Sequence, residues 1–130
     1  TSSSVEWDYK SFRLVGGNKL IVPLDIWYAQ RWDDETNQLV PLPEGVEDFQ
    51  GFVVLDVSTE AITEQFNVSH TRERGTCSYC GGYLPMRSFV YSGDLMTVRE
   101  NTVVSTDLKT GKEVWRMTLS IDGEPTECCY

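Results

Sequence analysis

The chain has 130 residues, which is near the commonest size of a single domain and enough to form one hydrophobic core without cross-links. It has 20 acidic and 11 basic residues, so its formal net charge is −9. Because Lys and Arg supply most of the affinity for nucleic acid, this charge argues against a nucleic-acid partner. No apolar run reaches the roughly 20 residues of a membrane span. We therefore expect one domain over residues 1–130, with no membrane span.

The N-terminal third predicts strands, because its apolar runs are short, rich in β-branched and aromatic residues, and separated by turn residues. The first strand is predicted over Trp7 to Val15, with a bulge, before a turn at residues 16–18. The second strand, Lys19 to Trp32, is apolar on both faces, which is typical of a central strand. Pro23 has no N–H to donate and indicates an edge or a break at that point.

The middle of the chain is less regular. Residues 33–37 predict a polar turn, and Pro41, Pro43 and Gly45 predict an irregular segment after it. Phe52 to Val57 is predicted to be a strand. Ser58 to Phe66 favours a helix capped by Ser58 or Thr59. Its stripe would contain Ala61, Ile62, Gln65 and Phe66, whereas a strand would place Ile62, Phe66 and Val68 on one face.

The C-terminal third predicts an antiparallel meander of three strands, Leu95 to Val98, Val103 to Asp107 and Lys112 to Ile121. The last of these strands alternates between apolar and polar side chains. The apolar set, which we expect to face the core, is Trp115, Met117, Leu119 and Ile121. The polar set, which we expect to face outward, is Arg116, Thr118 and Ser120.

Residues 105–115 resemble the blade motif of quinoprotein-type propellers through Asp107, Thr110, Gly111 and Trp115. A propeller needs this motif repeated around a ring, and it occurs here once. We therefore interpret the segment as a β-hairpin in which Gly111 adopts a positive φ.

Taken together, these elements predict an all-β fold of about seven to nine antiparallel strands, with at most one short helix. We expect a small antiparallel barrel, similar in general shape to a lipocalin. A β-sandwich is the alternative.

Four cysteines form two pairs, Cys77-Ser-Tyr-Cys80 and Cys128-Cys129. Because a disulfide between adjacent cysteines is strained, we expect two disulfides that cross between the pairs. The segment Asn67-Val68-Ser69 is an acceptor sequence for N-glycosylation, and the chain begins without Met. With the even cysteine count, these features predict a secreted or otherwise extracytoplasmic protein, with a cytoplasmic location as the alternative.

The same cysteines allow a zinc site, because Cys77-x-x-Cys80 followed by glycine has the shape of a zinc knuckle. The ligands would be Cys77, Cys80, Cys128 and His70, the sole histidine. The protein would then be a zinc-stapled intracellular interaction domain. Zinc and free, reduced thiols are the alternative interpretations of the cysteines, and without zinc we expect no cofactor. A redox-active dithiol is disfavoured, since no helix is predicted after Cys80.

The common enzyme signatures are absent: the sequence has no Gly-rich phosphate loop, no GxSxG and no HExxH. A non-catalytic role is therefore favoured. A carboxylate-based hydrolase is the alternative, in which paired acidic side chains would flank a cleft. The candidate carboxylates are Glu44, Glu47, Asp48, Glu60 and Glu64.

The chain is rich in aromatic residues, with four Trp, six Tyr and five Phe. Most should lie in the core, where their large surfaces are buried. The group Trp27, Tyr28, Trp32, Tyr79 and Tyr83 is larger than one strand face can bury, and we predict that these residues bind a ligand. The predicted function is binding of a protein partner or a small apolar ligand, through an acidic, aromatic-bearing surface or the barrel interior.

Overall fold

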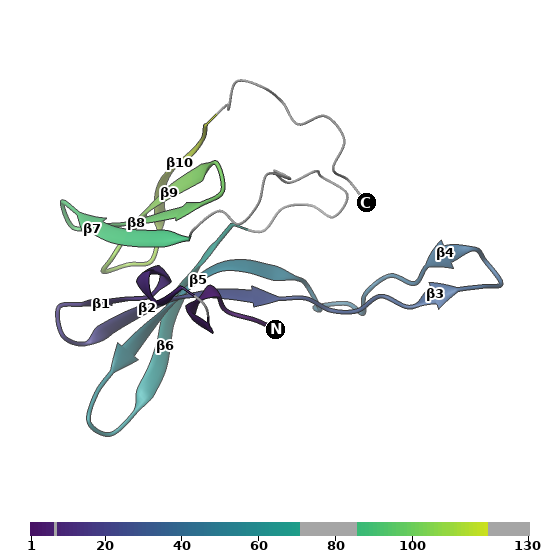
Figure 1. Cartoon of the computed structure of the whole chain (residues 1–130), viewed down its shortest axis with the longest axis horizontal. Coiled ribbons are helices and arrows are strands. Elements are labelled where there is room, and N and C mark those ends of the chain that lie inside the picture. Colours follow the sequence, from purple (N-terminus) through teal and green to yellow (C-terminus); the bar gives the residue numbers. More distant parts are fainter. Residues whose placement is uncertain (7, 71–85, 120–130) are drawn as a thin grey trace.

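The computed structural model describes residues 1–6, 8–70 and 86–119, and over these residues the fold is all-β (Figure 1). Neighbouring strands pair antiparallel throughout. The strands are β1 (Arg13–Val15), β2 (Lys19–Ile26), β3 (Trp32–Asp33), β4 (Gln38–Leu39), β5 (Phe49–Val57), β6 (Ile62–Ser69), β7 (Arg87–Tyr91), β8 (Asp94–Arg99), β9 (Thr102–Asp107) and β10 (Glu113–Thr118). Two 3₁₀ turns, η1 (Ser4–Glu6) and η2 (Tyr9–Ser11), precede them.

The strands form two four-stranded sheets, in the orders β1-β2-β5-β6 and β10-β9-β8-β7, and a separate β3–β4 hairpin. One hydrophobic core joins the two larger sheets. It contains Ile21, Phe52, Val54 and Val68 from the first sheet, and Leu95 and Val104 from the second, with Met86 beside them. The all-β prediction and the C-terminal meander are confirmed.

The predicted barrel is wrong, because the sheets do not close. Within the described residues β1 pairs only with β2 and β6 only with β5, while β10 pairs only with β9 and β7 only with β8. A barrel would need a ladder between these outer strands. The arrangement is instead compatible with the sandwich alternative, in which two sheets cover a shared core.

Strand β2 is central, yet one of its sides is open at Pro23. The short strand β1 covers only Lys19 to Ile21, and beyond it Ser2 exchanges backbone hydrogen bonds of 2.9 Å with Asp25. Backbone groups two residues apart point to the same side of a strand, so the nitrogen of Pro23 faces this N-terminal segment and not β5. Ser3 Oγ donates to the Pro23 carbonyl at 2.5 Å, so the edge predicted at Pro23 is confirmed.

The predicted first strand is mostly wrong, because only its last three residues, Arg13–Val15, pair as strand β1. The Asp8 carboxylate accepts a hydrogen bond from the Lys10 backbone N–H and so caps the 3₁₀ turn η2. The same carboxylate binds Arg87 of β7 at 2.6 Å. This long-range ion pair, together with the cap, favours the turn over a strand. Strand β2 likewise ends at Ile26, six residues before the predicted end.

The favoured helix over Ser58 to Phe66 is also wrong, and the strand interpretation of this segment is correct. Ser58 closes the turn between β5 and β6, because its Oγ accepts from the backbone N–H groups of Glu60 and Ala61. Gln65 is an extra residue in the β5–β6 ladder and changes the alternation there. Val68 is therefore buried and Phe66 packs against the core, whereas Ile62 is 65% exposed.

The face of β10 that we expect to point into the core points away from it. Arg116 lies opposite the buried Val104, while Trp115 lies opposite Ser105 and Met117 opposite Val103 on the other face of the sheet. Trp115 and Met117 are 41% and 47% exposed. The predicted alternation of side chains along β10 is correct, but the predicted choice of the buried face is wrong. The core face of this sheet is rich in hydroxyls, so apolar character does not mark it. The buried hydroxyl residues are Ser88, Thr97, Thr102 and Thr106. Leu119 is exposed, and residues 120 and 121 lie outside the described part of the chain.

Polar contacts also tie the two sheets to each other and to the N-terminal segment. The most buried ion pair among the described residues joins Asp25 of β2 to Arg99 of β8, whose side chains are 14% and 10% exposed and whose charged atoms lie 2.5 Å apart. Further contacts join Asp8 to Arg87, His70 Nε2 to Thr97 Oγ1 at 2.8 Å, and Arg116 to the Ser69 carbonyl at 2.8 Å. Because each involves a strand of the second sheet, these contacts fix how that sheet lies on the first.

Replacing Arg99 with Met should destabilise the fold by about 3 kcal/mol, because Asp25 would be left as a buried charge without its partner. The double variant Asp25→Asn/Arg99→Met should recover about half of that loss, since neither charge then remains. Urea unfolding of both variants measures these differences. A single variant within about 0.5 kcal/mol of the wild type would contradict a structural role for the pair.

The Asp8 side chain should make stability depend on acid. Its hydrogen bond to Arg87 lowers its pKa below the ordinary value of 3.8. A depressed pKa contributes stability that is fully present above the ordinary carboxyl pKa and is lost as the pH falls through the folded value. Asp8→Asn should therefore flatten the loss of stability below about pH 4. Urea midpoints measured across this range test it, and identical acid profiles for both proteins would contradict it.

Gly51 should tolerate no side chain. A Cβ there would clash with the Val68 carbonyl oxygen of the paired strand β6 and would approach the Phe49 ring. Gly51→Ala should cost about 3 kcal/mol of unfolding free energy. Gly17→Ala is the matched control, because Gly17 faces open space at φ 78° and should cost only about 1 kcal/mol of backbone strain. Equal midpoints in urea for the two variants would refute the close approach of β5 and β6.

Candidate binding site on a projecting hairpin

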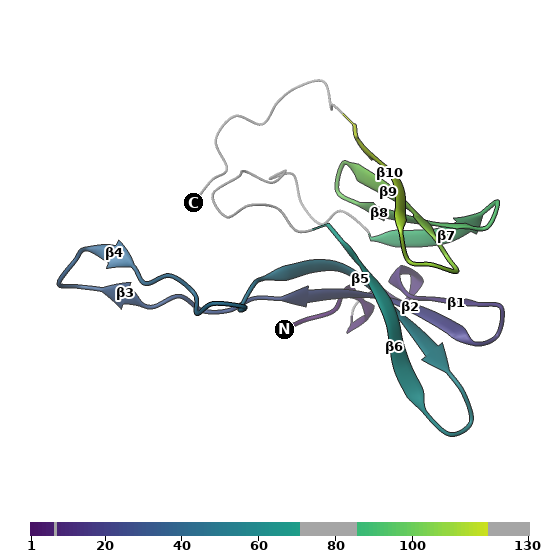
Figure 2. The ribbon, with the colours of Figure 1, turned by 180° about the vertical axis from the view of Figure 1, so that it is seen from behind.

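Residues 27–48 leave the first sheet as a single excursion, which we call the arm. The β2–β5 ladder ends at the pair Ile26 and Phe49, and the chain between them continues outward to β3 and β4. Figures 1 and 2 show β3 and β4 far from both four-stranded sheets. The arm is therefore an extension of the β2–β5 hairpin.

Hydrogen bonds join the two sides of the arm along its length. At its base the Tyr28 backbone N–H donates to the Asp48 carboxylate at 3.0 Å. Farther out, the Val40 backbone N–H donates to the Arg31 carbonyl at 2.8 Å, and the Gln30 side chain donates to the Val40 carbonyl at 3.4 Å. These contacts hold the arm as a hairpin.

The returning side of the arm is longer than the outgoing side. It accommodates the extra residues in a turn, where the Val46 backbone N–H donates to the Pro43 carbonyl at 3.0 Å and Gly45 adopts φ 78°. The irregular segment predicted from Pro41, Pro43 and Gly45 is confirmed.

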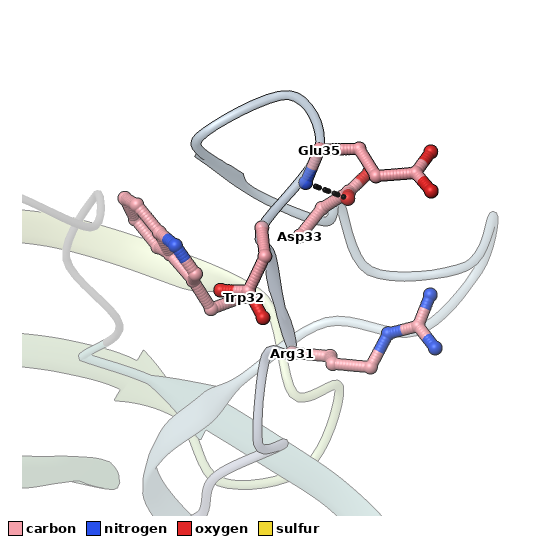
Figure 3. A pocket seen from close by; sticks show the side chains of 5 residues that line it. Arg31, Trp32, Asp33 and Glu35 are labelled. Atoms are coloured by element: carbon pink, nitrogen blue, oxygen red, sulfur yellow. Dashed lines mark hydrogen bonds between the residues drawn. The ribbon is translucent and has the colours of Figure 1, made fainter.

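The tip of the arm is the polar turn predicted at residues 33–37. The structure pairs Asp33 with Gln38 across it. One carboxylate oxygen of Asp33 accepts the Glu35 backbone N–H at 3.0 Å, as drawn in Figure 3. Asn37 closes the turn at φ 54°, a left-handed conformation that Asn tolerates better than most residues.

Three of the five predicted ligand-binding aromatics lie on the arm and are exposed. Trp27 and Tyr28 follow β2 directly, with exposed fractions of 55% and 44%, and Trp32 begins β3 at 50%. Leu39, opposite Trp32 in the hairpin, is 53% exposed. The other two predicted aromatics, Tyr79 and Tyr83, lie outside the described residues.

A shallow hollow of about 610 Å³ lies near the tip and is lined by Arg31, Trp32, Asp33, Asp34 and Glu35. In Figure 3, Trp32 and Arg31 point to opposite sides of the strand. The arm as a whole carries six carboxylates against one arginine, a net charge of −5 within a chain of net charge −9. Acidic and aromatic side chains thus share one projecting surface.

The structure does not bring the hydrolase candidates together. Glu44, Glu47 and Asp48 belong to the arm, whereas Glu60 and Glu64 belong to the β5–β6 hairpin. Figures 1 and 2 show these two hairpins extending in different directions. The described sheets also enclose no barrel interior, because they do not close.

The disulfide and zinc candidates Cys77, Cys80, Cys128 and Cys129 lie outside the described residues. His70 is described: it is 5% exposed, its ring meets Phe52 edge to face, and its Nε2 lies 2.8 Å from the Thr97 hydroxyl. Among the described residues no group of three or more His, Cys, Asp or Glu side chains is arranged to hold a metal ion. The cysteine predictions stay predictions.

Sequence reasoning identified the aromatics but missed the arm itself. The predicted strand Lys19 to Trp32 ran through its base, so Trp27 and Tyr28 were assigned to a sheet. The available signal was charge: six of the 20 acidic residues fall within residues 27–48. A segment so acidic is solvated on most of its surface, which argues against a buried strand.

No helix in the described part of the chain is long and apolar enough to cross a membrane. Comparison with models of protein families, with curated proteins and with solved structures finds no match for this chain. The candidate site is therefore defined by its own geometry and charge: an acidic hairpin with exposed Trp27, Tyr28 and Trp32.

Proposed function

We propose that the protein is a non-catalytic binding module whose arm docks on a basic surface of another protein. The observation that carries this proposal is the coincidence, on residues 27–48, of a net charge of −5 with three half-exposed aromatic side chains. Each half of that combination has a separate role in recognition.

The carboxylates supply attraction at a distance. A surface of one sign accelerates the encounter with an oppositely charged partner and excludes like-charged ones. Asp33, Asp34 and Glu35 are consecutive at the tip, which is the part of the arm farthest from the second sheet (Figure 1). The tip therefore meets a basic partner first.

The aromatic residues supply contact area. Trp and Tyr are enriched among the few residues that dominate interface energetics, because each buries a large rigid surface at a low entropy cost. Trp32 and Leu39 face each other across the hairpin and present about half of their surface to solvent. The carboxylates of Asp33, Asp34 and Glu35 follow Trp32 in the chain. They would form the polar rim that surrounds the apolar centre of a typical protein interface.

The backbone of the arm is organised before binding. The cross-strand bonds at Tyr28, Gln30 and Val40 hold its two sides in register. A surface that is already ordered loses less conformational entropy when a partner binds. This favours recognition by the arm over recognition by an unstructured acidic tail.

An octa-arginine peptide is a suitable first probe, because it carries the proposed partner's charge. The tip variant Asp33→Asn/Asp34→Asn/Glu35→Gln should weaken its binding by about tenfold, as measured by fluorescence anisotropy at low salt. Binding should also fall steeply between about 0.05 and 0.5 M NaCl. Asn at position 33 keeps the acceptor for the Glu35 N–H, so the turn should remain.

The matched control is Glu6→Gln/Glu60→Gln/Glu64→Gln, which removes the same three charges from exposed positions outside the arm. It should bind the peptide nearly as well as the wild type. Trp32→Ala should reduce affinity with little change in the salt dependence, because it removes contact area and leaves the charge unchanged. Equal weakening by the tip variant and the control would contradict the arm as the site and leave only a non-specific effect of net charge.

A further inference from the structure

The face of the first sheet that points away from the core is apolar along β1, β2 and β5. Directly opposed residues in a ladder share a face, and residues two apart in one strand do so too. The core side carries Ile21, Phe52 and Val54, so their neighbours along β2 and β5 lie on the other side. The apolar residues of this outer face are Leu14, Leu20, Val22, Leu24, Ile26, Phe49, Val53, Leu55 and Val57. Strand β6 adds Ile62, Glu64, Asn67 and Ser69 at the edge.

The apolar side chains of β1, β2 and β5 on this face keep part of their surface exposed; Leu14 is 56% exposed and the others are half-buried. Strands that are apolar on both faces are typical of sheets covered on both sides. Contiguous apolar surface of this kind marks a contact in most proteins. Something that covers the outer face is therefore expected.

The N-glycosylation acceptor lies on this same outer face. In the register, Asn67 of β6 is opposite Val53 of β5, which is opposite Val22 of β2. Ser69, the third residue of the acceptor sequence, lies two positions along the strand and so points to the same side as Asn67. Both residues are exposed, and β6 is an outer strand of its sheet. No other Asn-x-Ser/Thr triplet occurs in the sequence.

We propose that Asn67 is an N-glycosylation site and that its glycan covers the outer face of the first sheet. In the transfer, Asn67 Nδ2 bonds to the anomeric carbon of a lipid-linked oligosaccharide. The bond from that carbon to the lipid pyrophosphate breaks, and Nδ2 loses one proton, so no oxidant or reductant is needed. The Asn67 side chain is exposed, and its amide donates a 3.4 Å hydrogen bond to the exposed Glu64 side chain.

A second copy of the chain fits this face less well than a glycan. Three strands of eight or nine residues and the three-residue β1, about 4.8 Å apart, present a flat area of roughly 440 Å², below the roughly 800 Å² that each partner of a standard interface buries. Two copies would also bring net charges of −9 together. A glycan attached to Asn67 would already lie at the edge of this face. It is uncharged where it contacts the face, so the negative charge of the chain does not oppose it.

The proposal does not depend on the arm, because Asn67 belongs to β6 and the arm joins β2 to β5. The chain should be secreted from eukaryotic cells behind a signal peptide, and its intact mass measured before and after an amidase that removes N-glycans. The wild type should carry the mass of one glycan. Ser69→Ala should abolish it and Ser69→Thr should keep it, since Thr is also accepted in the third position.

Whether the glycan covers the outer face is measured separately, with a dye that becomes fluorescent when it binds exposed apolar surface. Amidase treatment converts Asn67 to Asp, so Asn67→Asp is the matched glycan-free control. Both should bind several-fold more dye than the glycosylated protein. Secreted wild type without a glycan would overturn the site. Equal dye binding with and without the glycan would overturn its covering role, and a glycan-free protein that elutes as a dimer would assign the face to a second copy.

Discussion

The antiparallel ladder between β2 and β5 is the constraint on which the rest of the structure depends. It runs without a break from Lys19 opposite Asp56 to Ile26 opposite Phe49. Because side chains alternate strictly along a strand, this one register decides which residues face the core and which face outward. It also decides where the arm begins, since the chain leaves the ladder at Ile26.

Three features with different chemistry follow from that register. On the inner side it places Ile21 and Phe52 in the core and brings Asp25 to Arg99, so the second sheet is held by both apolar packing and a buried ion pair. On the outer side it gathers Val22 and Val53 into an apolar face with no charged residue from either strand. Beyond the ladder it extends into a hairpin of net charge −5. The acidic and apolar surfaces are therefore separate, and they suit different occupants.

Local signals in the sequence identified the fold class well. The meander of β8, β9 and β10 was recognised from alternation and turn residues, and Gly111 adopts the positive φ, 73°, that the hairpin interpretation required. The exposure of Trp27, Tyr28 and Trp32 follows from an aromatic group too large for one strand face to bury, while their role in binding stays a prediction. These successes share a cause: each depends on residues that are close together in the chain.

The errors came from contacts between distant residues. The segment Tyr9–Ser11 is a turn partly because Asp8 binds Arg87, 79 positions away. The helix expected after Ser58 is a strand because β5 offers a ladder to β6. Alternation along β10 shows which residues share a face but not which face is buried. The hydroxyl-rich core face that decides this belongs to β7, β8 and β9. Closure into a barrel depends on strand pairing that local pattern does not encode.

The register of β2 against β5 is tested most directly by cross-strand NOEs between α protons. Asp25 directs its backbone groups to Ser2, so Ile21, Pro23 and Asp25 form the closely spaced pairs with β5. We expect strong α-proton contacts for Ile21 with Val54, Pro23 with Phe52, and Asp25 with Gln50. Contacts displaced by one residue would contradict the account, because they would exchange the inner and outer faces of the first sheet and move the start of the arm.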